Sequence, residues 1–353
     1  MPSANSDIKQ SHEFEFTGKA GEYFKIWIVN IVLTILTLGI YSAWAKVRNK
    51  RYFYGNTHLD GSSFEYTASP ISILKGRLIA FAVIGVYVVA VSFYPVTKPV
   101  FWLIFVTALP VLVVKALTFN ARNSVFRNIR FDFRGRYGDA FMVLIGLMLL
   151  NIVTLGLAFP YYIYREKQFV VANSGFGVSR FGFDATAKSF YGVYLKAFGL
   201  LLLLVIAYAI LGTATAIPVA QGAGTPAAVD PVRMAMLMVP MLLVVPIYIF
   251  IGAYVNAATI NLFMNGAHIK QQRLKSTLGA GRLFWIYLSN LLAVLVSLGL
   301  LIPWARIRLA RYRFDNLSVE STGGLDTFVA GMQGDVKATG EELADVLDVD
   351  LGL

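Results

Sequence analysis

Long apolar runs separated by short polar segments fill most of the chain. Seven runs are candidates for crossing a bilayer, which takes about 20 apolar residues per helix: residues 24–45, 78–94, 101–114, 141–164, 191–217, 234–262 and 283–305. Of the 353 residues, 57% are hydrophobic and 14% charged, whereas roughly 25% charged is usual in a soluble domain. We therefore expect a polytopic α-helical membrane protein.

The polar segments between the runs show a second pattern, in which aromatic and polar residues alternate. It occurs in residues 12–16, 56–66, 128–133 and 173–183, next to Gly, Ser and Asn. Alternation with a period of two, bounded by these residue types, predicts short strands and hairpins. The expected fold class is therefore a membrane protein of repeated helix and β-hairpin units, with a small β-rich cytoplasmic cap.

A motif occurs three times at the polar end of an apolar run. Residues 37–48 (TLGIYSAWAKVR) and 297–308 (SLGLLIPWARIR) match in register, and residues 154–165 hold a weaker copy. Matches of this quality indicate internal duplication. We place the repeats at about 16–66, 133–183 and 278–320 in an integrated membrane domain, residues 14–317. A polar N-terminal tail (1–13) and an acidic C-terminal tail (318–353) flank it.

The basic residues give two possible topologies. If all seven runs cross the bilayer, the basic hairpin segments alternate between its two sides, against the rule that short cytoplasmic loops are rich in Lys and Arg. If the three motif runs enter and leave on one face, only Lys98 and Arg233 of the 31 Lys and Arg lie opposite. Gly39, Gly156 and Gly299 sit inside these runs, where a helix can break. Four full crossings with re-entrant motif runs, or seven crossings, remain open.

The motif carries basic and aromatic side chains at the membrane edge. An Arg fork suits bidentate recognition of a phosphate group, although bases there also set orientation alone. The candidate lipid- or phosphate-binding residues are Lys46, Arg48, Arg51, Arg165, Arg306, Arg308 and Arg311. Aromatic rings at this depth are typical of an interfacial belt. The candidate interfacial aromatic residues are Trp44, Tyr161 and Trp304.

Several kinds of chemistry find no support in the sequence. The chain has no cysteine and only three histidines, without the spacing of paired metal ligands, so we expect no metal and no cofactor. It has neither a phosphate-binding GxxxxGK[ST] loop nor a GxSxG nucleophile motif, and we expect no catalytic residues and no enzyme. The net charge of +11 fits the positive-inside rule and anionic lipids better than nucleic acid.

The first motif copy and the segment after it resemble a known family. Residues 36–48, Arg51, Tyr52 and residues 60–66 are similar to the YjgN-like family of bacterial inner-membrane proteins, and the resemblance extends from about Phe14 to about Asn316. The middle copy departs from the pattern, because Pro160, Tyr161 and Tyr162 replace the Trp-Ala pair. The resemblance implies a location in the bacterial inner membrane. It supplies no activity or site, because the family has no assigned function.

We expect a non-enzymatic, multi-pass inner-membrane protein that binds or transports an anionic amphiphile or lipid at the cytoplasmic edge of the bilayer. The expected partners are membrane lipids, preferably anionic, and no nucleic acid. The alternative is a structural or assembly role, in which the basic hairpins dock another protein or a second copy of the chain.

Overall fold

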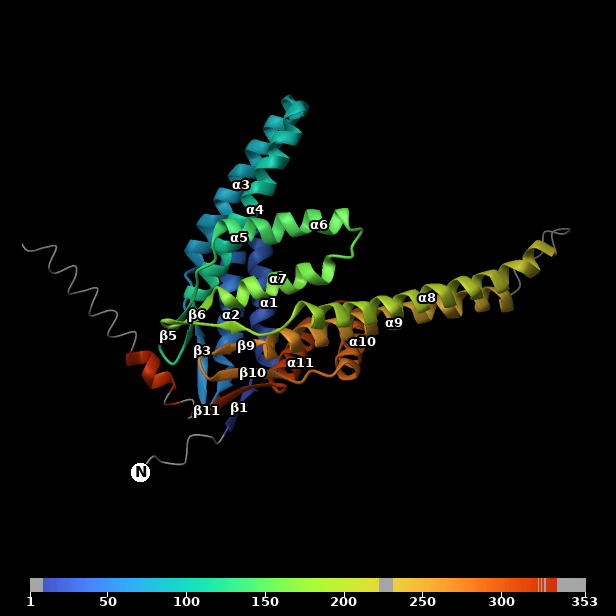
Figure 1. Ribbon diagram of the computed structural model, residues 1–353. Helices are drawn as coiled ribbons and strands as arrows, with labels where there is room; N and C mark the ends of the chain where they lie inside the picture. Colours follow the sequence, from blue (N-terminus) through green and yellow to red (C-terminus); the bar gives the residue numbers. More distant parts are fainter. Residues whose placement is uncertain (1–8, 222–230, 323, 325, 327, 335–353) are drawn as a thin grey trace, which may run out of the picture. The chain divides into compact units, whose positions relative to one another are not determined.

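The computed structural model describes residues 9–221, 231–322, 324, 326 and 328–334 (Figure 1). Its strands are β1 (Lys9–Phe16), β2 (Thr57–Leu59), β3 (Ser62–Tyr66), β4 (Ser124–Phe126), β5 (Ile129–Phe133), β6 (Ser174–Phe176), β7 (Ser179–Arg180), β8 (Gly182–Phe183), β9 (Ala267–Ile269), β10 (Gln272–Ser276) and β11 (Leu317–Thr322). Its helices are α1 (Ala20–Leu36), α2 (Ser42–Gly55), α3 (Pro70–Phe93), η1 (Pro95–Thr97), α4 (Lys98–Arg122), α5 (Tyr137–Phe141), η2 (Met142–Gly146), α6 (Leu147–Val153), α7 (Phe159–Ala172), α8 (Ala187–Gln221), α9 (Pro231–Asn265), α10 (Ala280–Val296) and α11 (Ile302–Phe314).

The strands form one antiparallel sheet that nearly closes into a barrel. The order is β7-β6-β5-β4-β3-β2-β1-β11-β10-β9-β8, so its two ends, β7 and β8, are consecutive pieces of one stretch of chain. The first piece pairs with β6 and the second with β9. Between them, the Phe181 N–H donates to the Ser174 carbonyl at 3.0 Å. The chain therefore passes from one end of the sheet to the other almost without a gap.

The barrel corrects the expected fold class. The β part is not a small cap on a purely helical protein, but an eleven-stranded sheet that encloses its own core. The cause is the alternation noted in the sequence, which gives strands such as β1, β3 and β5 one apolar face. A lone two-stranded hairpin cannot bury such a face, whereas closure buries all of them together.

The strands follow helices through a recurrent junction. In the described part of the chain, five junctions lead from a helix into a strand with an Asn at or just after the helix end. These residues are Asn56, Asn123, Asn173, Asn265 and Asn316. Four of these amides donate to the carbonyl four residues earlier, at 2.7–2.8 Å. Each amide therefore adds a hydrogen bond to the last turn of a helix, where the backbone alone leaves carbonyls unsatisfied; at Asn56 and Asn123 the same carbonyl also accepts the backbone N–H.

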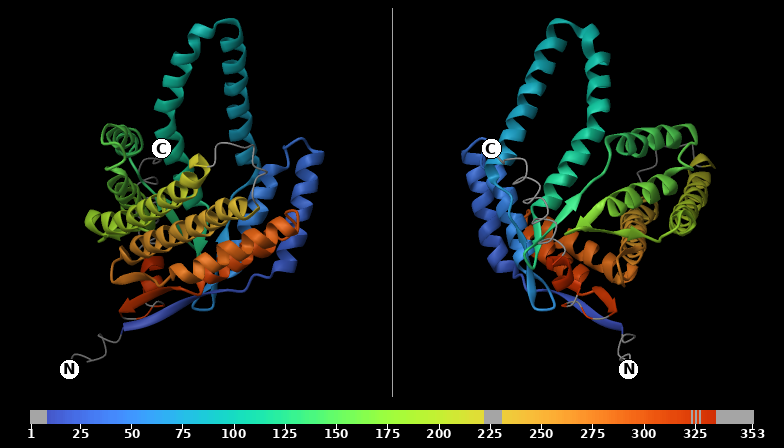
Figure 2. Two further views of the ribbon diagram at one scale, coloured as in Figure 1. Left: turned by 90° about the vertical axis from the view of Figure 1, so that its right-hand side faces the viewer. Right: turned by 60° about the vertical axis from the view of Figure 1, so that its left-hand side comes forward.

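Each motif run consists of two helices rather than one. The first run breaks at Leu38 and Gly39, with φ values of 49° and 91°. The Gly39 N–H bonds the Thr34 carbonyl at 2.7 Å, the six-residue closure that ends helices. The pairs Leu155-Gly156 and Leu298-Gly299 repeat these φ values. Figure 2 shows α1 and α2 folding back on each other.

Four helical segments are long and apolar enough to cross a membrane among the residues that the structure describes. They are Pro70–Phe93, Pro95–Arg122, Ala187–Ala207 and Val244–Asn265. Two shorter apolar helical stretches, Tyr137–Val153 and Ala280–Val296, belong to the second and third motif runs. The number of crossings in a bilayer stays a prediction.

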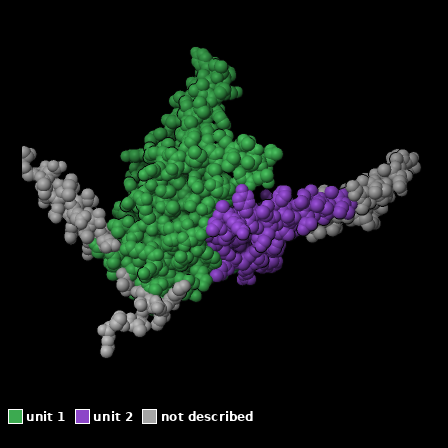
Figure 3. All heavy atoms as spheres, in the orientation of Figure 1, with its two compact units in different colours: residues 1–185, 263–276, 302–353 green, residues 186–262, 277–301 purple. Residues whose placement is uncertain are grey.

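The chain divides into two compact units (Figure 3). Unit 1 comprises residues 1–185, 263–276 and 302–353 and contains the whole sheet. Unit 2 comprises residues 186–262 and 277–301. Within unit 2, the Asn261 amide exchanges two hydrogen bonds with the backbone of Leu278, at 2.9 and 3.0 Å. The sequence division into tails and a membrane domain stays a prediction, and residues 335–353 of the acidic tail lie outside the described part.

Candidate site: an apolar cavity inside the barrel

The barrel of unit 1 contains a cavity of about 670 Å³. This volume lies within the range of about 300–1,000 Å³ that is usual for small-molecule sites. Its walls are mainly aromatic and aliphatic side chains from the inner face of the strands. Those that contribute to the buried core are Phe14, Leu59, Phe64, Phe126, Phe131, Phe176, Phe181, Ile269, Leu274 and Val319.

The aromatic rings of the wall pack against one another around the barrel. The ring centroids of Phe64 and Phe126 lie 4.5 Å apart, and those of Phe131 and Phe176 lie 4.9 Å apart. Phe14 of β1 stacks on Phe64 of β3 at 6.0 Å, across the intervening strand β2. These distances are typical of aromatic pairs that hold a fixed arrangement. The wall is therefore a preformed apolar surface.

One end of the cavity is formed where the helices enter the barrel. The residues there come from the C-terminal ends of four helices: Phe53, Tyr54, Leu117, Asn120, Ala121, Met264 and Phe314. Tyr54 shares a hydrogen bond with Ser124 at 3.0 Å, and Asn120 accepts one from the Lys50 ammonium at 2.6 Å. The polar atoms at this end are thus engaged with each other.

The opposite end is closed by a segment after β11, which we call the closing segment (Asp326 and residues 328–334). Its residues 328–334 are helical. Val329 and Met332 are 4% and 0% exposed and pack into the barrel core. The Ser179 hydroxyl lies 3.5 Å from the Met332 sulfur. The closing segment therefore supplies the apolar cover of the barrel.

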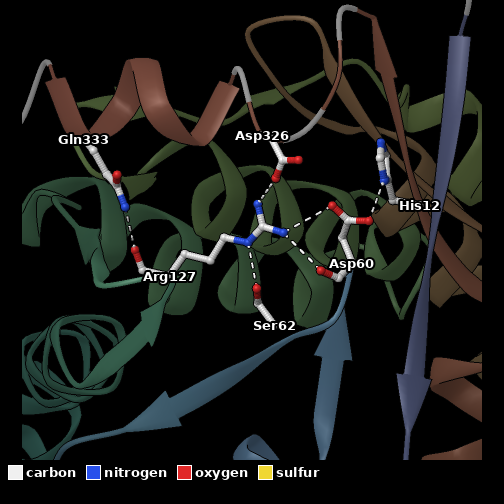
Figure 4. Close-up of polar contacts among 6 residues, drawn as sticks. All are labelled: His12, Asp60, Ser62, Arg127, Asp326 and Gln333. Carbon is white, nitrogen blue, oxygen red and sulfur yellow. Dashed lines mark hydrogen bonds and ion pairs between the residues drawn. The ribbon is translucent and has the colours of Figure 1, made fainter.

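Polar contacts at this end centre on Arg127, in the β4–β5 turn (Figure 4). Its guanidinium donates to the Ser62 hydroxyl at 2.9 Å and to the Asp60 carboxylate at 3.1 Å, and it pairs with Asp326. The Gln333 amide donates to the Arg127 carbonyl at 3.0 Å. One arginine thus joins two hairpin turns to the closing segment.

Sequence reasoning missed both the cavity and this arginine. The available signal was the turn chemistry: Asp60 and Gly61 have φ values of 51° and 71°, which a two-residue hairpin turn requires, and Arg127 and Asn128 occupy the equivalent turn with 47° and 66°. Such turns place their side chains at one end of a barrel. Nothing local in the sequence indicates that the closing segment meets them there.

The predicted basic residues lie on the helices, away from the cavity wall. Arg51 bonds the carbonyls of Tyr66 and Ala68, both at 3.3 Å, and Arg311 bonds the Gly18 carbonyl at 3.0 Å. These two arginines each tie a helix to the segment that leaves a strand. A structural role thus accounts for their contacts, and lipid binding by them stays a prediction.

The other predicted residues have varied surroundings. Arg306 donates to the Tyr23 hydroxyl at 3.1 Å, and Arg308 lies over the Trp304 ring at 5.1 Å. Lys46 and Arg48 are exposed, and Arg165 is half-buried. Trp44 stacks on Tyr41 at 6.2 Å, and Tyr161 packs against Tyr164 at 6.1 Å. Among the described residues that line the cavity, none belongs to the predicted set.

The pKa values of two carboxylates near the barrel, Asp132 and Asp315, differ from their ordinary value. Burial alone would raise the pKa of Asp132, but hydrogen bonds from Arg134, the Phe133 N–H and Arg122 outweigh it and hold the pKa below its ordinary value. Burial raises the pKa of Asp315, opposed by Arg311 and reinforced by Glu15. In the described ranges, no group of three or more His, Cys, Asp or Glu side chains could hold a metal ion.

Residues 11–346 match the family described as "Bacterial protein of unknown function (DUF898)". The chain belongs to this family. It is 27% identical to "Inner membrane protein YjgN" of Salmonella typhimurium strain LT2, over 92% of this chain and 91% of that protein. Proteins with the same name from Escherichia coli O157:H7 and strain K12 are 30% and 29% identical over 42% and 48% of the chain. No solved structure matches the chain.

The family membership fixes the location of the protein. The relatives are inner-membrane proteins, and the helices include segments able to span a bilayer, so the chain is a protein of the bacterial inner membrane. The resemblance stated from the sequence is confirmed. The family has no assigned activity, so the comparison gives neither a substrate nor a reaction.

Proposed function

We propose that this inner-membrane protein is a binding protein that holds the hydrocarbon part of an amphiphile inside its barrel, at the cytoplasmic edge of the bilayer. The observation that carries the proposal is the cavity of about 670 Å³ with its aromatic wall. An apolar space of this size lacks the contacts that packed cores normally have, and an apolar ligand would restore them.

The single sheet supports the cytoplasmic placement. Its strands pair through backbone hydrogen bonds, so all the helix–strand junctions lie on one side of the membrane. That side also carries the basic hairpin segments, and the positive-inside rule assigns it to the cytoplasm. The three motif runs then enter and leave on one face.

Helix lengths fit this re-entrant arrangement. α1 has 17 residues, which span about 26 Å at 1.5 Å per residue, less than the hydrocarbon thickness of about 30 Å. α2 carries Lys46, Arg48, Lys50 and Arg51, and such a helix is a poor candidate to cross. In this proposal, the exposed Lys46 and Arg48 contact anionic headgroups around the protein.

The proposal assigns no reaction to the protein, and transport would require a path through the helices that the cavity alone does not supply. The alternative, a docking role for the basic hairpins, stays a prediction.

Filling the cavity tests the proposal. Ala121→Phe places a ring in the cavity lining, whereas Ala172→Phe makes the same change at an exposed position one residue before Asn173. Each protein, purified in amphipol, is titrated with the neutral apolar probe N-phenyl-1-naphthylamine. We expect saturable fluorescence in the wild type and in Ala172→Phe, and at least tenfold weaker binding in Ala121→Phe with unchanged circular dichroism. Equal saturable binding in all three would refute a cavity site.

A further inference from the structure

The inner face of the barrel carries two buried polar atoms without a partner at the end covered by the closing segment. Gln272 is 5% exposed and lines the cavity, and its side-chain oxygen Oε1 has no hydrogen-bond partner among the described residues. Ser321 is 0% exposed, and within the same part of the chain its hydroxyl also lacks a partner. An unpaired buried polar group destabilises the fold, so two of them close together call for an explanation.

Strand register places these two groups side by side. Leu274 is paired with Val319, and both line the cavity. Gln272 and Ser321 each lie two residues from this pair, so both side chains share the cavity face. Arg273 pairs with Glu320, and continuing this register by one residue sets Gln272 opposite Ser321, where Cβ atoms are typically about 4.5–5.5 Å apart. Gln272 lines the cavity and Ser321 does not, so a ligand group bonded to Gln272 lies next to the buried Ser321 hydroxyl.

The chemistry of this end favours a neutral polar group over an ion. The Gln272 oxygen only accepts hydrogen bonds, and the Ser321 hydroxyl both donates and accepts. A hydroxyl group on the ligand satisfies both, whereas a carboxylate or phosphate has no proton to give the Gln272 oxygen.

Two arginines near this end are already engaged. The guanidinium of Arg127 is bonded to Asp60, Ser62 and Asp326. Arg273, the one Lys or Arg among the described lining residues, pairs with Asp184 at 3.0 Å. An anionic head brought here would find neither of these two guanidinium groups free to offset its desolvation.

We infer that the cavity takes a neutral, single-chain amphiphile with a hydroxyl-bearing head, whose hydroxyl groups bond Gln272 and Ser321 beneath the closing segment. The inference rests on the proposed function and names its ligand class. It also changes the ligand expected from the sequence, which was an anionic amphiphile. Anionic lipid would surround the helices, and the cavity inside the barrel would take an amphiphile with an uncharged head.

Competition between two matched ligands tests the inference. 1-Oleoylglycerol and oleate share one acyl chain and differ in the head, and at pH 8 oleate is an anion. Each is used to displace N-phenyl-1-naphthylamine from the wild type, Gln272→Leu, Ser321→Ala and the control Gln271→Leu, which alters the exposed neighbour. We expect 1-oleoylglycerol to displace the probe at a concentration at least tenfold lower than oleate. The preference should fall to about threefold or less in Gln272→Leu and Ser321→Ala and persist in Gln271→Leu.

A second readout separates ligand recognition from a structural role. If these groups are unpaired in the empty protein, replacing them by apolar ones should leave its melting temperature unchanged or raise it. A clear fall in both variants would show that internal partners such as buried water already satisfy them, and would overturn the inference. Equal displacement by the two ligands would also overturn it, while leaving cavity binding intact. Loss of saturable probe binding in the wild type would instead remove the proposed function.

Discussion

Closure of the barrel by the closing segment should depend on apolar burial rather than on its ion pair. Asp326 is 83% exposed, and exposed pairs of this kind contribute about 0–1 kcal/mol. Met332 is 0% exposed, and truncating a buried methionine to alanine costs about 2–5 kcal/mol. At about 1.4 kcal/mol per factor of ten, Asp326→Asn should raise the open population less than about fivefold, and Met332→Ala at least about thirtyfold.

The absence of native cysteine makes opening measurable. Val329→Cys introduces a single thiol of similar volume at a position that is 4% exposed, and its rate of labelling by a soluble maleimide reports how often the closing segment lifts. We expect the rate to rise at least about thirtyfold in the Met332→Ala background and less than fivefold in the Asp326→Asn background. Gly331→Ala, on the same segment, is the control for helix propensity. A larger effect of Asp326→Asn, abolished by high salt, would refute the reasoning and make closure electrostatic.

Two further predictions concern the helix breaks and the stability of the fold at low pH. Gly39→Ala forces an alanine into φ +91° and should destabilise the protein by about 1–3 kcal/mol in thermal melts. The control Gly21→Ala changes an open helical position and should leave the stability unchanged or raise it. Equal effects of the two substitutions would show that alanine is not strained at the helix break. Because the pKa of Asp132 is below its ordinary value of 3.8, its stabilising contribution is present above that pH and lost as pH falls through the lowered pKa. Asp132→Asn should therefore be less stable than the wild type at pH 7, and a stability gap that stays constant down to pH 2 would contradict this.

Local features were predictable from the sequence, and closure of the sheet was not. The breaks at Leu38 and Gly39, and the turn at Asp60, follow from glycine placement and alternation within a few residues. In the middle motif copy, Leu155 and Gly156 adopt the same φ values although the aromatic part of the motif differs. Local backbone chemistry thus survives where the side chains change.

The parts that were missed depend on contacts far apart in the chain. Closure requires β1 to pair with β11, for example Gln10 with Ser321, and no local signal encodes that register. For the same reason, the charge of residues 318–334 predicted an acidic tail. The segment instead contains most of strand β11 and the buried Met332. The cavity is a product of this closure, so sequence reasoning placed the candidate site on the motif arginines instead.

The central claim, one barrel on the cytoplasmic side with its cavity inside, is tested most directly by accessibility of single cysteines. Probes at Asn56, Asn128, Asn173, Asn265 and Asn316 report helix–strand junctions and one hairpin turn of the sheet, without background from native thiols. In intact spheroplasts, we predict that all five resist an impermeant maleimide and react after permeabilisation. Labelling of Asn173 and Asn265 in intact spheroplasts, with Asn56 and Asn128 protected, would establish seven crossings and contradict a single barrel.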